Sequence, residues 1–159
     1  MDKELRRNQN TLVMSGIGVI VFGVWSLIRF LMYILINARS LRAELGLESG
    51  TKYAVFYLVV ALLLLADLGL RVYVGRAAIR EGMKDKAGRV YVAIAVFLAA
   101  SAAFSAYQDF LTFSEAYTDV ADGYAATLAD ITSLVILVQL VISSLRLKRM
   151  RRNAARREA

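Results

Sequence analysis

The sequence predicts an all-α integral membrane protein with four transmembrane helices in an up-down antiparallel bundle. Hydrophobic residues make up 58% of the chain's 159 residues, more than the roughly 45–50% that is usual for soluble domains. They are concentrated in four runs, each long enough for the roughly 20 residues that cross a bilayer. The runs lie at about 11–36, 54–75, 90–113 and 124–145. They leave no room for a soluble domain, so we expect residues 1–159 to form a single four-span membrane domain.

The first run follows a polar segment, residues 1–10, and we expect Asn10 or Thr11 to cap its helix. The run is longer than the roughly 7–15 apolar residues of a cleavable signal peptide, so we expect it to remain in the mature protein. The second run is expected to continue as a helix past residue 75, with Gly82 as its C-cap.

The third run is rich in Ala and Ser, and the chain contains no Pro, so its helix is expected to persist to about Phe113. Small residues let helices approach closely in lipid. Gly16 and Gly23 in the first run therefore predict a close helix contact, and the Ala- and Ser-rich third run is its expected partner. The fourth run ends in a strongly basic tail, residues 146–159.

The distribution of Lys and Arg predicts the orientation. Sixteen of the 20 Lys and Arg residues lie in the two terminal segments and around the turn between the second and third runs. Cytoplasmic loops carry such an excess of positive charge. We therefore predict a multi-pass protein of the plasma or inner membrane with both termini in the cytoplasm. Tyr73 and Tyr91 are expected in the aromatic belt on that side.

Composition also excludes several chemistries. The chain has no Cys and no His, which excludes disulfides, thiol or imidazole catalysis and Cys/His zinc sites. It contains no Gly-rich phosphate loop and no Ser-centred nucleophile motif. We therefore expect no enzymatic activity, no cofactor and no metal. The net charge of +7 lies beside apolar runs, which indicates contact with a membrane surface and not with nucleic acid.

Ionisable residues inside the runs are the strongest candidate functional residues, because each destabilises a membrane helix unless it is paired or hydrated. Asp67 is the deepest. Arg71 lies four residues later on the same helix face, and Gln139 of the fourth run lies at a similar depth. We expect an Asp67–Arg71 ion pair and a hydrogen bond from Gln139 to Asp67. In the functional alternative, Asp67 takes up a proton or a cation.

A second candidate cluster lies toward the opposite surface. Arg29, Asp130 and Asp109 fall at comparable depths in three different runs. They predict either a vestibule that binds a small ion or a polar head group, or an ion pair that ties the first and fourth helices together.

The tail supplies the candidate lipid contacts. Its basic residues would attract anionic head groups on the cytoplasmic face by about 1 kcal/mol each; the candidates are Arg146, Lys148, Arg149, Arg151 and Arg152. We predict a non-enzymatic inner-membrane protein that acts through association with itself, with lipid or with a membrane partner. The alternative is a small oligomeric ion or solute transporter or channel that uses Asp67 and the Arg29/Asp130 cluster.

Overall fold

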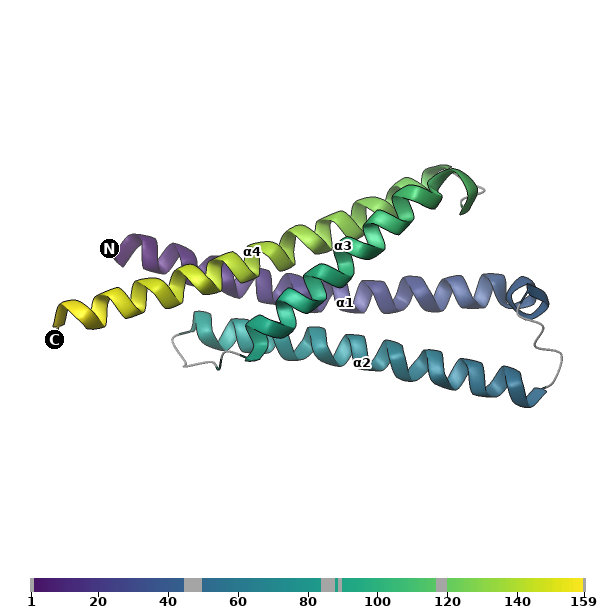
Figure 1. Ribbon diagram of the computed structural model, residues 1–159, viewed down its shortest axis with the longest axis horizontal. Coiled ribbons are helices and arrows are strands. Elements are labelled where there is room, and N and C mark those ends of the chain that lie inside the picture. The colour runs from purple at the N-terminus through teal and green to yellow at the C-terminus, as the bar shows by residue number, and fades with distance from the viewer. Residues whose placement is uncertain (1, 45–49, 84–87, 89, 117–119, 159) are drawn as a thin grey trace.

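The computed structural model describes residues 2–44, 50–83, 88, 90–116 and 120–158. These contain four helices: α1 (Asp2–Glu44), α2 (Gly50–Gly82), α3 (Val90–Ala116) and α4 (Val120–Glu158). Successive helices run in opposite directions, and both termini lie at the same end of the molecule (Figure 1). We call this the terminal end. Each helix contains a segment long and apolar enough to cross a membrane, which confirms the predicted all-helical class with four candidate spans.

The helices extend beyond the predicted spans. The 43 residues of α1 correspond to about 64 Å at 1.5 Å per residue, about twice the thickness of a bilayer's hydrocarbon core. This helix begins at Asp2, so the prediction that Asn10 or Thr11 caps it is wrong. The Thr11 hydroxyl instead donates a hydrogen bond to the Arg7 carbonyl oxygen one turn earlier, at 2.9 Å. The polar N-terminal segment therefore continues the apolar helix without a break.

The α2 helix ends at Gly82 as predicted, and the Met83 N–H donates to the Ile79 carbonyl oxygen at 3.0 Å. The structure also supplies a second reason for a glycine here. A Cβ atom at Gly82 would lie 2.6 Å from Val13 Cγ2 and 2.9 Å from the Gln9 carbonyl oxygen. The close approach of α1 therefore requires the missing side chain.

Glycines bring α1 and α2 into direct backbone contact. A Cβ at Gly16 would lie 2.7 Å from the Gly75 carbonyl oxygen, and one at Gly75 would lie 2.6 Å from that of Gly16. Gly23 faces Arg71, whose Cδ would be 2.9 Å from an added Cβ. The expectation that the third helix is the partner of these glycines is therefore wrong. Glycines on α2 allow a closer approach than the Ala and Ser side chains of α3 would.

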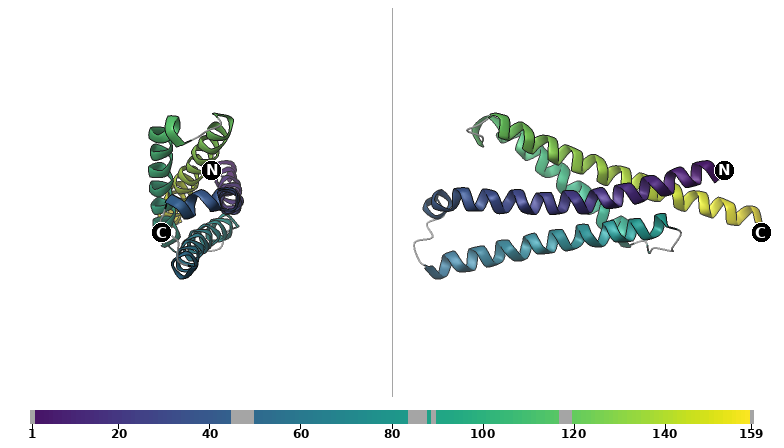
Figure 2. Two further views of the ribbon diagram at one scale, coloured as in Figure 1. Left: turned by 90° about the vertical axis from the view of Figure 1, so that its right-hand side faces the viewer. Right: turned by 180° about the vertical axis from the view of Figure 1, so that it is seen from behind.

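The α4 helix contacts all three other helices. Its buried residues Ser133, Leu137, Leu140, Ser144 and Leu147 follow alternating steps of four and three, which places them on one face. Among the side chains that the structure describes, the buried hydrophobic cluster comprises Leu12, Val19, Val74, Ala78, Tyr91, Ala95, Leu98, Leu137, Leu140 and Leu147. Toward the opposite end the α3–α4 hairpin diverges from the α1–α2 hairpin (Figures 1 and 2).

Candidate functional site: paired charges along α4

The first polar contact along α4 joins two of the residues predicted to meet. Arg29 of α1 donates from Nη1 to Oδ2 of Asp130 of α4, at 3.3 Å. Their side chains are 38% and 30% exposed, so the pair lies near the surface of the protein. It links α1 to α4. The side chain of Asp109, the third predicted member of this cluster, lies outside the described residues.

The second contact is centred on Arg71. Its Nε donates to Asp67 Oδ2 at 2.8 Å, the predicted pair one turn apart on α2. Its Nη1 donates to Ser133 Oγ of α4 at 3.2 Å. The Arg71 side chain is 13% exposed, whereas that of Asp67 is 40% exposed. One guanidinium thus pairs with the Asp67 carboxylate and connects α2 to α4.

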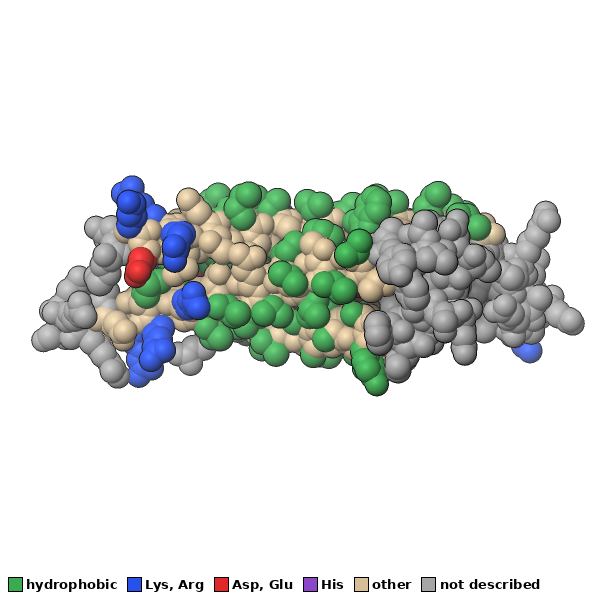
Figure 3. Space-filling view, turned by 90° about the horizontal axis from the view of Figure 1, so that it is seen from above, with side chains coloured by type: hydrophobic (Ala, Val, Ile, Leu, Met, Phe, Trp, Pro, Cys, Tyr) green, Lys and Arg blue, Asp and Glu red, His purple; other side chains and the backbone are tan. Residues whose placement is uncertain are grey.

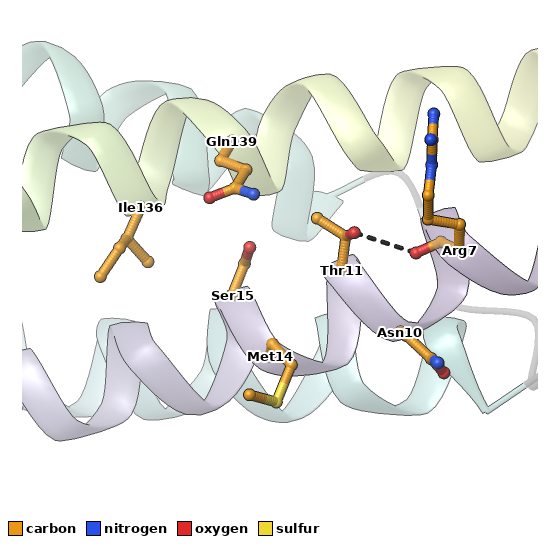
Figure 4. A pocket seen from close by; sticks show the side chains of 7 residues that line it. All are labelled: Arg7, Asn10, Thr11, Met14, Ser15, Ile136 and Gln139. Atoms are coloured by element: carbon orange, nitrogen blue, oxygen red, sulfur yellow. Dashed lines mark hydrogen bonds between the residues drawn. The ribbon is translucent and has the colours of Figure 1, made fainter.

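Gln139 is not the partner of Asp67 that the sequence predicted. It lies on the side of α4 that faces α1, where its side chain points toward that of Ser15 (Figure 4). Both residues line a groove between the two helices. The α4 residue that reaches the Asp67–Arg71 pair is Ser133, which is six residues earlier and on a different face.

The third contact is a buried polar cluster that sequence reasoning missed. Glu81 of α2, Tyr91 of α3 and Ser144 of α4 are each 1% exposed or less. The Tyr91 hydroxyl donates to Glu81 Oε2 and lies 2.6 Å from Ser144 Oγ. The three helices are therefore joined at one point by side chains shielded from the surroundings. Tyr91 was expected in an interfacial belt, and its burial in the core corrects that prediction.

Two basic residues of the tail complete this cluster. Lys148 Nζ lies 3.8 Å from Glu81 Oε2 and 4.9 Å from the centre of the Tyr91 ring. Arg151 donates to the Glu81 backbone carbonyl oxygen at 3.0 Å. A buried carboxylate needs such partners, because an unpaired buried charge is strongly destabilising. Among the described residues, each buried side-chain nitrogen and oxygen has a hydrogen-bond partner.

The predicted lipid-binding residues therefore divide into two groups. Lys148 and Arg151 turn inward to Glu81, while Arg146, Arg149 and Arg152 are exposed. The α4 helix includes them all, because it runs unbroken to Glu158. Figure 3 shows basic side chains gathered at the terminal end and hydrophobic side chains over the middle of the molecule. The sequence contained a pattern that groups Lys148 and Arg151 with Ser144. The three residues follow steps of four and three, which places them on one face of α4.

Comparisons of the chain with protein-family models, with curated proteins and with solved structures find no match. Function must therefore be inferred from its own residues. Among the described residues, no group of three or more Asp and Glu side chains is placed to hold a metal ion. The charged residues instead form contacts between helices, in which α4 supplies a partner to each of the other three.

Proposed function

We propose that this protein is a non-enzymatic inner-membrane protein, a fixed four-helix bundle that works through association with itself, with lipid or with a membrane partner. The paired charges are the observation that supports it. Arg29 bonds to Asp130, and Asp67 and Ser133 both bond to Arg71. These groups tie helices together, as a scaffold requires. A path for ions would instead need side chains that can exchange partners.

The outer surface agrees with a membrane location. Leu58, Leu62 and Leu63 of α2 are 59% to 66% exposed. Leucines exposed to this extent along a helix are expected where lipid or another membrane protein covers it. The distribution of basic residues supports an orientation with both termini in the cytoplasm, where the exposed Arg146, Arg149 and Arg152 would meet anionic lipids.

One observation favours transport as a second candidate function. The Asp67 side chain is 40% exposed although it lies within an apolar helix. A carboxylate that remains accessible there is a site where a proton or a cation could bind. In that case the protein is a small oligomeric transporter or channel, and Asp67 and the Arg29/Asp130 pair lie on its path.

A flux assay separates the two candidates. Purified protein is reconstituted into liposomes, and the movement of protons, Na⁺ and K⁺ down an imposed gradient is measured for wild type, Asp67→Asn and protein-free vesicles. If the protein is a fixed scaffold, the ion flux should be the same in all three preparations. A flux that wild type carries and a folded Asp67→Asn variant loses would reject the scaffold in favour of transport.

A labelling experiment tests the orientation. Because the chain has no Cys, single substitutions Ser49→Cys and Arg152→Cys can each be probed in intact cells with a membrane-impermeant maleimide. Position 49 lies outside the described residues, between α1 and α2, and we expect it to label from outside. Arg152→Cys should label only after the membrane is opened, and the reverse pattern would overturn the proposed orientation.

A further inference from the structure

A groove of about 360 Å³ lies between α1 and α4 near the terminal end (Figure 4). Its position is distinct from the charge pairs described above. The residues that line it come from two turns of α1 and from one turn of α4: Arg7, Asn10, Thr11, Met14, Ser15, Ile136 and Gln139.

The groove contains one positive charge, the guanidinium of Arg7, which can only donate hydrogen bonds. Asn10, Ser15 and Gln139 can each donate or accept. The Thr11 hydroxyl already donates to the Arg7 carbonyl oxygen. None of the seven lining residues, all of them described, is acidic. One positive charge and no negative charge in the lining favour an anionic ligand over a cation.

The groove also spans a definite depth. Arg7 and Ser15 are eight residues apart on α1, about 12 Å along the helix axis. The polar interface of one bilayer leaflet is roughly 5–8 Å thick. A ligand whose anionic group contacts Arg7 at the level of the head groups would therefore extend through the interface toward Ser15 and Gln139.

The remaining lining is apolar. Met14 is 70% exposed, and Ile136 packs against Gly18, where an added Cβ would lie 3.2 Å from the Ile136 side chain. The missing side chain at Gly18 thus lets α4 approach α1 closely beside the groove. A free phosphate would contact Arg7 and leave this apolar part unused. A phospholipid matches both parts of the groove, with its phosphate at Arg7, an ester carbonyl at Gln139 and the start of an acyl chain at Ile136.

We propose that the groove between α1 and α4 is a binding site for one anionic phospholipid of the cytoplasmic leaflet. The proposal rests on the proposed function, because it requires the helices to lie in a membrane. Arg7 binds the phosphate by charge-assisted hydrogen bonds, and Gln139 donates to an ester carbonyl where the interface meets the hydrocarbon core. The lipid in turn satisfies an amide that would otherwise lie against hydrocarbon tails.

Native mass spectrometry of the full chain in an uncharged detergent tests the site. The protein is titrated with phosphatidylglycerol, with phosphatidylcholine and with water-soluble glycerol phosphate. We expect one phosphatidylglycerol to bind in preference to phosphatidylcholine, with glycerol phosphate a poor competitor. Arg7→Ala should weaken this binding about tenfold, because one charge-assisted hydrogen bond contributes about 1.4 kcal/mol or more. Gln139→Leu should weaken it by a smaller factor at unchanged charge.

Arg6→Ala is the matched control, since Arg6 is also exposed and carries the same charge but does not line the groove. We expect it to change binding by less than about twofold. Equal losses of phosphatidylglycerol affinity for Arg6→Ala and Arg7→Ala would overturn the proposal. They would indicate only a diffuse attraction of the anionic lipid to the basic terminal end. Glycerol phosphate binding as tightly as the lipid would also overturn it, in favour of a small-anion site. Either result would leave the proposed function standing, because that function is tested separately by flux and by labelling.

Discussion

The buried contact between Tyr91 and Glu81 gives the sharpest stability prediction. Tyr91→Phe removes the hydroxyl that donates to Glu81 and contacts Ser144 but keeps the ring, so it leaves no large cavity and preserves the Lys148 contact. Glu81 would then depend on Lys148, whose Nζ is 3.8 Å away and beyond hydrogen-bond distance.

The expected loss follows from the burial of the acceptor. Interhelical hydrogen bonds in membrane proteins contribute about 0.6 kcal/mol on average and about 1.7 kcal/mol at most. Hydrogen bonds to charged groups contribute about 1.5–3 kcal/mol. Because the Glu81 side chain is only 2% exposed, we expect the free energy of unfolding to fall by about 2 kcal/mol for Tyr91→Phe, which is roughly a 30-fold change in the folding equilibrium.

Reversible unfolding in mixed micelles, titrated with sodium dodecyl sulfate, measures this loss. Tyr107→Phe is the matched control, because Tyr107 lies on the same helix and is 60% exposed; its free energy of unfolding should be unchanged within about 0.5 kcal/mol. In a Glu81→Gln background the loss from Tyr91→Phe should shrink to about 1 kcal/mol, since the acceptor is then neutral. A loss for Tyr91→Phe no larger than that for Tyr107→Phe would refute the assignment of this cluster as a structural anchor.

The same unfolding assay checks three further predictions. Gly75→Ala should lower the free energy of unfolding by about 1–3 kcal/mol through overpacking against α1, whereas Gly69→Ala, whose Cβ would meet nothing within 4 Å, should raise it by about 0.5–1 kcal/mol; equal effects would contradict the glycine contact. For Arg29 and Asp130, a double-mutant cycle with alanine should give a coupling of about 0.6 kcal/mol, and strict additivity would show that the ion pair contributes nothing. Ser133→Ala should also lose about 0.6 kcal/mol, less than Tyr91→Phe, and a loss above about 2 kcal/mol would contradict this ranking.

Local patterns predicted part of the candidate site. The Asp67–Arg71 pair follows from four-residue spacing on one helix, which holds whatever the other helices do. The Arg29–Asp130 pair was predicted from depth. Two opposite charges at one level in neighbouring helices stabilise each other when they pair, because an unpaired charge inside a membrane is costly. The residue that contacts Arg71 on α4 was not predictable in this way. Depth alone does not say which face of α4 is turned toward α2.

The sequence by itself determined the helical class and the four apolar segments, because both depend on run length and composition within a single stretch of chain. Helix pairing was decided only in the tertiary structure. The contact between Gly16 and Gly75 needs two distant backbones in one register, and the Glu81–Tyr91–Ser144 cluster needs three helix faces at one point. In the sequence, Glu81 stands among basic residues. Its burial, and the inward turn of Lys148 and Arg151, follow from the packing of α2, α3 and α4 against one another, which no single helix specifies.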